Sequence, residues 1–356
     1  MTPCVDLPYR ERMRPWLFSR NLDIAAFGGS ALLSLALVAV GVPLGLIDKD
    51  APEWAWIATV LLVDVAHVWG SLLLVYTDRQ ELARRPLLYA LAPLLSLTVA
   101  TALASESEAW FWRALAYLAV LHFVRQQVGW VKLYRARARD VAGVGAFVDV
   151  GATYAAALGP LVWWHAHLPA SFSWFVQGDF VAGLPAACGT AALVLEAAFL
   201  TAYAVRAARR FTAGRGNPGM DLVVASTALL WWLGIVALRS DYVFTVTNVI
   251  AHGVPYVVLI AWTGRRRRER GLSVAVALRF GAGALVLALW ACAFVEEGAW
   301  DVLVWHERPS LWPVALHVDL SSWRWVVLPL LALPQMTHYV LDGFLWKRRD
   351  NPVLAD

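Results

Sequence analysis

Long apolar runs recur along the whole chain with short loops between them, and this pattern leaves few folds open. A bilayer core about 30 Å thick is crossed by roughly 20 helical residues, and many of the runs reach that length. Hydrophobic residues make up 60% of the chain and charged residues only 16%, whereas soluble domains carry roughly 25% charged residues. Backbone polar groups in lipid must be satisfied within the segment, so such runs form helices. The sequence therefore predicts an all-α integral membrane protein.

Apolar runs bounded by charged or turn residues predict about ten transmembrane helices. We expect them at 25–47, 53–77, 86–105, 109–132, 143–166, 180–205, 219–238, 241–263, 273–295 and 323–346. No second domain is indicated, so residues 1–356 are interpreted as a single polytopic transmembrane domain. Outside the spans, the largest segments are a short N-terminus at 1–24, an external loop at 296–322 and a C-terminus at 347–356.

The basic residues are distributed unevenly between the two sets of loops. One set, which includes both termini, holds 23 of the 30 Lys and Arg residues. Because Lys and Arg near span ends are retained in the cytoplasm, both termini are predicted to be cytoplasmic. We expect a multi-pass protein of the bacterial inner (cytoplasmic) membrane, with membrane lipids as partners. The basic pI does not indicate nucleic-acid binding, because these residues lie in short loops beside spans.

Four histidines lie near the middle of four separate predicted spans: His67, His122, His252 and His338. Ionisable side chains in the bilayer core are costly and usually mark a functional site. In the predicted topology these four spans run in the same direction. At about 1.5 Å per helical residue, the four histidines differ in depth by only roughly 6 Å. They are therefore expected to form one layer near the midplane of the membrane.

Two carboxylates share helix faces with these histidines. Asp64 lies one turn before His67, and Asp342 lies one turn after His338. Imidazole and carboxylate together suit a transition metal, and a mixed ligand set with spare members favours an open mono- or dinuclear centre over a closed zinc site. Carboxylates one turn away could equally orient the imidazole rings. The predicted metal ligands are His67, His122, His252, His338, Asp64 and Asp342, with iron as the leading metal and zinc or copper as alternatives.

Six further polar residues fall at similar depth and are candidates for an outer shell or a proton relay. They are Gln126, Asp149, Glu196, Asn248, Arg125 and Arg279. For Asp149, Glu196 and Arg279 an alternative stays open, because a buried arginine can neutralise a buried carboxylate in a structural pair. The sequence does not assign a catalytic residue.

Familiar catalytic motifs are absent. The chain has no P-loop, no H-E-x-x-H, no G-x-S-x-G and no dinucleotide fingerprint. It also lacks the clustered histidine boxes of membrane fatty-acid desaturases and hydroxylases. In its multi-pass layout and its isolated intramembrane histidines, it resembles the Brp/Blh family of membrane carotenoid-cleaving dioxygenases, whose histidines are proposed to hold iron. The resemblance covers architecture alone, so no functional residue is carried over from that family. Segments 122–127 and 337–343 look like signatures of a bacterial multi-pass membrane protein family.

These features predict a membrane-embedded, metal-dependent oxidoreductase, similar to an oxygenase or desaturase, that acts on a lipid or isoprenoid substrate. A metal near the midplane is awkward for a water-soluble substrate, whereas a dry cavity protects reactive intermediates. A transporter or channel with a His/Asp/Glu relay is an alternative, although the internal repeats typical of transporters are not apparent. A haem protein with two axial histidines is less favoured, because two histidines would stay unexplained. A structural role, in which the polar layer locks the helices together, also stays open.

Overall fold

Helices make up all the regular secondary structure that can be described. The computed structural model describes residues 15–140, 142–169, 173–313, 320–348, 351 and 353–354, and within them there is no strand. Eight of the described helices are long and apolar enough to cross a membrane. The predicted all-α fold of a multi-pass membrane protein is confirmed at this level, whereas ten spans, cytoplasmic termini and a bacterial inner membrane stay predictions. Residues 1–14 of the predicted N-terminus, 314–319 of the predicted loop and most of 349–356 lie outside the described ranges.

The chain divides into two compact units. Unit 1 comprises residues 1–49, 123–171 and 181–251, and unit 2 comprises residues 50–122, 172–180 and 252–356. Helix α8 (Glu108–Arg137) contributes its first half to unit 2 and its second half to unit 1. The single polytopic domain stays a prediction.

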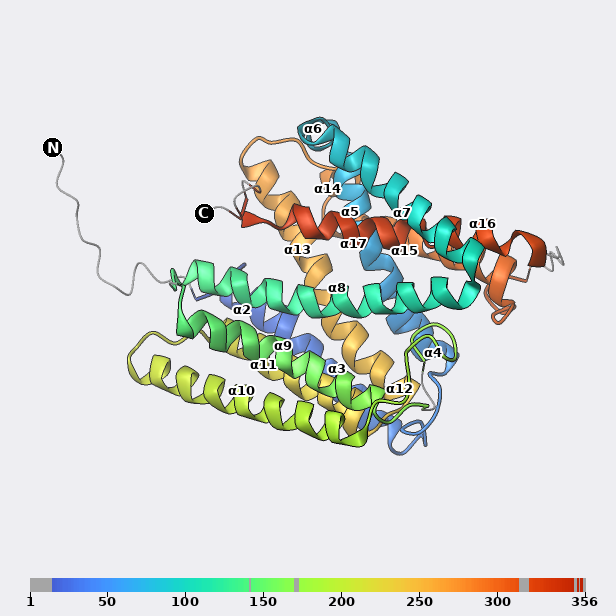
Figure 1. The fold of residues 1–356 in the computed structure, drawn as a ribbon. Helices are drawn as coiled ribbons and strands as arrows, with labels where there is room; N and C mark the ends of the chain where they lie inside the picture. The colour runs from blue at the N-terminus through green and yellow to red at the C-terminus, as the bar shows by residue number, and fades with distance from the viewer. Residues whose placement is uncertain are drawn as a thin grey trace. The chain divides into compact units, whose positions relative to one another are not determined.

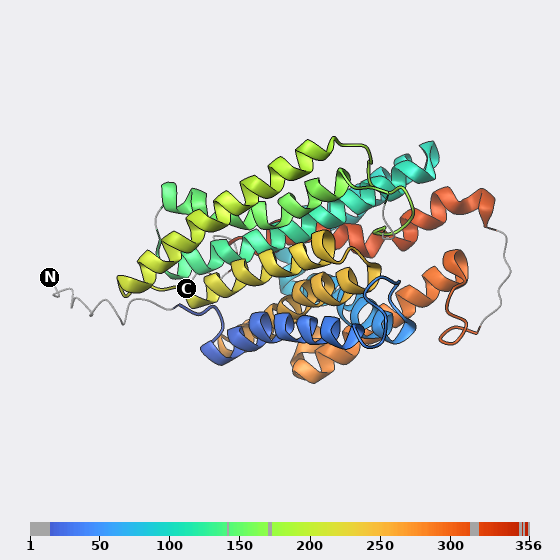
Figure 2. The same ribbon diagram turned by 90° about the horizontal axis from the view of Figure 1, so that it is seen from below.

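Unit 1 combines two long helices with a series of shorter segments. Its elements besides α8 are α2 (Arg20–Asp23), η1 (Ile24–Gly29), α3 (Ser30–Gly41), α9 (Val144–His165), α10 (Ala186–Thr212), α11 (Pro218–Trp231), η3 (Trp232–Ala237), α12 (Asp241–Phe244) and η4 (Thr245–Val249). Helices α9 and α10 run side by side along their length (Figures 1 and 2). Glycines on α9 permit this close packing, because a Cβ at Gly151 would clash with the ring of Phe199.

Unit 2 contains most of the remaining helices. They are α4 (Glu53–Trp56), η2 (Ile57–Val65), α5 (Ala66–Tyr76), α6 (Arg79–Arg84), α7 (Pro86–Glu106), α13 (Ile250–Glu269), α14 (Val276–Arg279), α15 (Ala282–Trp300), η5 (Asp301–Trp305), η6 (Ser321–Trp323), α16 (Arg324–Leu331) and α17 (Leu333–Leu345). Helix α17 packs against α5 and α7, and α15 packs against η2 and α5 (Figure 1). A Cβ at Gly253 of α13 would lie 3.0 Å from the carbonyl oxygen of Val63, so glycine lets α13 and η2 approach closely.

The ninth predicted span is displaced along the chain. The apolar run at 273–295 was expected to be the helix, but the helix begins at Ala282 and continues to Trp305. The sequence predicts that this span ends at residue 295, before Glu296 and Glu297, because charged residues usually mark span ends. In the structure the Trp69 indole N–H donates a 2.6 Å hydrogen bond to Glu296, so this acid is accommodated within the helix. The helix therefore occupies the first part of the predicted loop 296–322.

Two other predicted spans are helical but are not among the eight. Helix α8 is 30 residues long and carries Arg113, Arg125 and Lys132 within it. The last predicted span is interrupted at Ala332, between α16 of 8 residues and α17 of 13 residues. Pro329 and Pro334 flank the interruption, and proline removes a backbone donor from a helix.

Short π-helical segments interrupt several spans. These segments are rare in proteins and frequently occur at functional sites. Segment η2 contains Asp64 and ends two residues before His67, and η4 ends three residues before His252. Two of the four intramembrane histidines therefore follow directly after an irregularity in their helix.

Candidate metal centre

The four intramembrane histidines come together in unit 2. They lie on α5, α8, α13 and α17, and their exposed fractions are 2% for His67, 8% for His122, 0% for His252 and 0% for His338. The ring centroids of His67 and His252 are 4.6 Å apart, and so are those of His122 and His338. The centroids of His67 and His338 are 4.9 Å apart. Four imidazoles from four helices thus form one buried cluster.

The imidazoles face one another in two pairs through their Nε2 atoms. The Nε2 atoms of His252 and His67 are 3.0 Å apart, and those of His338 and His122 are 3.1 Å apart. Two nitrogen ligands about 2.1 Å from a shared ion lie about 3.0–3.4 Å apart for angles of about 90–110°. Each pair is therefore spaced as neighbouring ligands of one ion would be.

Among the residues that the structure describes, two groups of side chains could hold a metal ion, and both include His67. His67, His122 and His338 form one group, and Asp64, His67 and His252 form the other, with the candidate ligand atoms of each group within 4.8 Å of one another. The Nδ1 atom of His67 is hydrogen-bonded to the backbone carbonyl oxygen of Asp64. A carbonyl only accepts, so Nδ1 carries the hydrogen and only Nε2 offers a lone pair. Both groups require His67, so the arrangement favours a single ion.

Ser71 fixes the orientation of His338 in a similar way. The Ser71 hydroxyl lies 2.9 Å from Nδ1 of His338 and 3.4 Å from the carbonyl oxygen of Val68. If the hydroxyl donates to the carbonyl, its oxygen accepts from the Nδ1–H of His338. The Nε2 atom of His338 is then left with its lone pair directed at the cluster, as a metal ligand requires.

Asp342 lies beside the cluster with its carboxylate engaged by other donors. Its Oδ1 atom is 3.7 Å from Nδ1 of His338. The same oxygen accepts a hydrogen bond of 2.6 Å from the Tyr256 hydroxyl and one of 3.2 Å from the Trp346 indole. This position suits the orienting role that the sequence left open for Asp342, rather than that of a direct ligand. The Oδ1 atom of Asp64 lies 3.5 Å from Nδ1 of His67, and no side chain or backbone group in the described part of the chain forms a hydrogen bond with it.

Sequence reasoning missed several side chains around the cluster. The ring of Tyr256 packs edge-on against His67 with centroids 5.4 Å apart, and Tyr339 stacks on His122 at 4.7 Å. Tyr256 is one turn after His252, a signal that could have been read from the sequence. Glu297 is a further acid of this unit, and it lies on α15, which packs against the segment η2 that contains Asp64. The sequence signal for Glu297 is an acidic residue next to an apolar run. The same signal is typical of the end of a membrane span, so it does not distinguish the two cases.

Five of the six predicted outer-shell or relay residues belong to unit 1. These are Arg125, Gln126, Asp149, Glu196 and Asn248. Arg125 is exposed. Arg279 belongs to unit 2, is also exposed, and donates to the carbonyl oxygen of Val274. Within unit 2, the structure therefore gives the histidine cluster a different set of neighbours from the one the sequence suggested.

Asp149 is the centre of an ion-pair cluster in unit 1. It is fully buried, and it binds Arg135, Arg206 and Arg210, the last two at 3.0 Å. Two further aspartates complete the cluster, since Arg206 contacts Asp140 at 2.6 Å and Arg210 contacts Asp221 at 3.0 Å. Three arginines thus meet three aspartates, which is the structural pairing that the sequence left open for Asp149.

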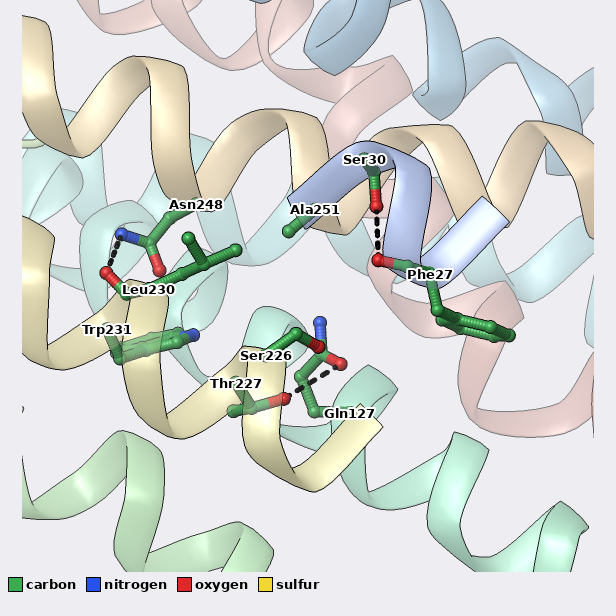
Figure 3. Close-up of a pocket in the computed structure, with 9 residues that line it drawn as sticks. All are labelled: Phe27, Ser30, Gln127, Ser226, Thr227, Leu230, Trp231, Asn248 and Ala251. Atoms are coloured by element: carbon green, nitrogen blue, oxygen red, sulfur yellow. Dashed lines mark hydrogen bonds between the residues drawn. The ribbon is translucent and has the colours of Figure 1, made fainter. Parts of the chain in front are cut away.

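Asn248 lines a small polar pocket in unit 1 (Figure 3). The pocket is lined by Phe27, Ser30, Gln127, Ser226, Thr227, Leu230, Trp231, Asn248 and Ala251. The Thr227 hydroxyl donates to Gln127 Oε1 at 3.3 Å, and the Asn248 amide donates to the Leu230 carbonyl at 3.4 Å. Asn248 Oδ1 is buried without a hydrogen-bond partner. The open space is about that of one water molecule, which suits a hydration site.

An ion pair joins the first residues of α16 and α8, two helices that lead to the cluster. Arg324 at the start of α16 donates from Nε to one oxygen of Glu108 at 2.9 Å and from Nη2 to the other at 2.5 Å. Glu108 is the first residue of α8, which carries His122. The hydrogen bonds from Arg324 hold the pKa of Glu108 below its ordinary value, although burial acts in the opposite direction.

No protein-family model, curated protein or solved structure matches the chain. A fold alone would not define an activity, because function depends on the chemistry of a site. The histidine cluster is therefore the basis for a functional interpretation.

Proposed function

We propose that this chain is a membrane-embedded, metal-dependent oxidoreductase whose four histidines hold one transition-metal ion. The observation that carries the proposal is the meeting of two Nε2 pairs, 3.0 and 3.1 Å apart, inside an apolar helical unit. Hydrogen bonds from Nδ1 leave the Nε2 lone pairs of His67 and His338 available. Neutral imidazoles suit iron, copper and zinc. The bonding of their other ring nitrogen is typical of metal-binding histidines.

Asp64 is the favoured additional ligand. Its Oδ1 atom is buried without a hydrogen-bond partner, and its group includes His67 and His252. Four imidazoles and one carboxylate would leave a position open for a substrate or oxygen on an ion that accepts six ligands. This ligand set favours iron over zinc, since zinc usually takes four ligands. A bound iron would supply the redox chemistry.

The proposed substrate is a lipid or isoprenoid. The cluster is buried among helices whose outer surfaces are apolar, with Leu87 75% exposed and Val295 71% exposed. An apolar substrate can approach such a site from the bilayer without crossing a polar surface. The residues around the cluster would exclude water and keep the imidazoles oriented, with Ser71 and Asp342 as positioning residues.

The geometry is less favourable for the alternatives. The two axial histidines of a haem lie on opposite faces of the macrocycle and are separated by it. Here the Nε2 atoms of each histidine pair are only 3.0 or 3.1 Å apart, which leaves no room for a macrocycle between them. An ion or proton relay and a purely structural cluster are compatible with the same residues, and the experiment below separates them from a metal centre.

The test is element analysis of the purified protein and of His67→Ala, His122→Ala, His252→Ala and His338→Ala. We expect about one transition-metal ion per wild-type chain and a large loss in each variant. His167→Ala is the matched control, because His167 lies just beyond the end of α9 and its Nδ1 atom bonds to the carbonyl of Trp163, four residues earlier. Wild-type protein without a transition metal, or four variants that all keep it, would contradict the proposal.

The redox part requires a separate measurement. Protein reconstituted with ferrous iron should consume oxygen when an unsaturated lipid or isoprenoid is added, and zinc-loaded protein should not. Equal oxygen consumption by the iron-loaded and zinc-loaded proteins would be compatible with a metal site but would contradict the oxidoreductase activity.

A further inference from the structure

Glu196 is a buried carboxyl group within a membrane-spanning helix. It belongs to α10, which is long and apolar enough to cross a membrane, and only 5% of its surface is exposed. Among the described residues, its carboxyl group forms no hydrogen bond and no ion pair. Other buried acids of the same unit, such as Asp149, bind arginines.

The charged groups of the two helices that pack here are directed elsewhere. Helix α10 packs along α9. The titratable and charged groups of these helices are Asp149, Tyr154, His165, Cys188, Glu196, Tyr203, Arg206, Arg209 and Arg210. Tyr203 donates to Asp221, and His165 bonds to the Leu161 carbonyl of its own helix. Among the described residues, none of these groups forms a hydrogen bond or an ion pair with Glu196.

Helix α9 provides a notch that fits this carboxyl group. A Cβ added at Gly159 would lie 2.5 Å from Oε2 of Glu196 and 3.0 Å from its Cβ, so only glycine leaves room for the acid. The next residue, Pro160, has no N–H, and the carbonyl of Ala156 therefore loses its usual helical donor. The carbonyl oxygen of Ala156, which lacks its helical donor, thus lies one turn from the notch on the helix that packs against Glu196.

An isolated carboxylate in an apolar interior is so unfavourable that the group takes up a proton instead. We propose that Glu196 is a proton-binding site of unit 1, whose neutral acid form is open to covalent modification by apolar carbodiimides. This inference is independent of the metal centre. It gives the chain a protonatable group within a span, which a proton-coupled process could use.

The chemistry of the probe reports the neutral acid directly. The carboxylic O–H adds across one C=N bond of dicyclohexylcarbodiimide and forms an O-acylisourea. The acyl group then moves to a nitrogen of the same molecule and gives a stable N-acylurea. No group leaves, so the peptide gains the mass of one carbodiimide.

The experiment treats the full-length protein in lipid nanodiscs with dicyclohexylcarbodiimide and maps the adducts by peptide mass spectrometry. We expect an adduct at Glu196 at pH 7 that decreases several-fold as the pH is raised. A water-soluble cationic carbodiimide should label the exposed Glu106 but not Glu196. Absence of the adduct at Glu196, or equal labelling by both reagents, would overturn the proposal. The wild-type protein alone decides this, so a misfolded variant would not obscure the outcome.

Two variants and one salt control sharpen the result. Glu196→Gln should remove the adduct from its peptide and leave other labelled peptides unchanged. Gly159→Ala should displace the carboxyl group and change its labelling several-fold, and unchanged labelling would refute the role of the notch. Sodium chloride at constant pH should leave the adduct unchanged. Protection by sodium but not by choline would mean that the site binds a metal cation rather than a proton.

Discussion

Buried polar groups have different kinds of partner in the two units. In unit 1, Asp149 is surrounded by three arginines, and the charges of the cluster cancel. In unit 2, four imidazoles meet, and their Nε2 atoms face one another in two pairs. A cluster of matched charges is complete and serves to hold helices together. A cluster of convergent lone pairs has capacity for a cation, which is why we assign structure to the first and metal binding to the second.

The largest expected effect is on the charged cluster. Asp149→Ala would leave three arginines without their shared carboxylate, and breaking a buried pair typically costs about 3–5 kcal/mol. We expect a marked loss of thermal stability in detergent, with the metal content of the remaining folded protein unchanged. Asp140→Ala is the matched control, because this partner is 27% exposed. If Asp149→Ala instead removed the metal and left stability unchanged, the contrast between the clusters would be wrong.

The next effect concerns the orientation of an imidazole. Ser71→Ala removes the acceptor for the Nδ1–H of His338, and loss of such a partner typically weakens metal binding by about 10–100-fold. Chelator competition measures the affinity, and the absorption spectrum of a cobalt-substituted sample reports ligand geometry. Thr98→Ala is the control, because this exposed hydroxyl bonds only to the Leu94 carbonyl of its own helix. Equal affinities of Ser71→Ala and wild type would show that Ser71 has no positioning role.

A smaller effect should depend on pH. Because Arg324 lowers the pKa of Glu108, their pair stabilises the protein above the ordinary glutamate pKa of 4.5, and this contribution is lost as the pH falls through the lowered value. Both side chains are partly exposed, so we expect less than about 1 kcal/mol. Glu108→Gln should therefore be less stable than wild type at pH 7, and the two should converge in acid. A difference that persists at low pH would mean that the ion pair is not the cause.

The smallest expected effect is in the polar pocket of unit 1. Asn248→Leu removes an amide whose oxygen has no partner and whose nitrogen makes hydrogen bonds of 3.1 and 3.4 Å. Replacing an incompletely satisfied polar group with an apolar one is often nearly neutral, so we expect a change within about 1 kcal/mol. Equilibrium unfolding would measure it. A loss as large as that of Asp149→Ala would show that this amide contributes as much to stability as the buried charge.

The sequence was sufficient to predict the helical membrane fold and the meeting of the four histidines. Span length and loop charge follow local rules, and a common depth on co-directional helices made convergence a reasonable expectation. The sequence was not sufficient to predict which groups the buried acids contact. Asp149 and Glu196 give the same signal, an acid within an apolar run, yet one binds arginines and the other lies against Gly159. Their partners come from other helices, so the difference depends on tertiary packing rather than on local sequence.

The predicted start of the long loop at residue 296 was wrong for the same reason, because it too depends on tertiary packing. Glu296 reads as a span end, and its partner Trp69 is 227 residues away in the chain. A pairing of that separation is not visible in hydropathy, which evaluates each window alone. Tyr256 was missed for a different reason, since a tyrosine in an apolar span is unremarkable until its hydroxyl is seen to donate to Asp342.

The π-helical segment η2 also determines how the chain tolerates changes in length. Each residue of an α-helix turns the chain by about 100°, so a single deletion in a regular helix swings everything on one side of it to a different face. The wider turns of Ile57–Val65 lie immediately ahead of His67 and already hold the backbone out of α-helical phase. A one-residue deletion there could be taken up by a return to regular α-helical winding, with His67 still facing its three partners. This segment is where homologous proteins would be expected to gain or lose a residue without losing the centre.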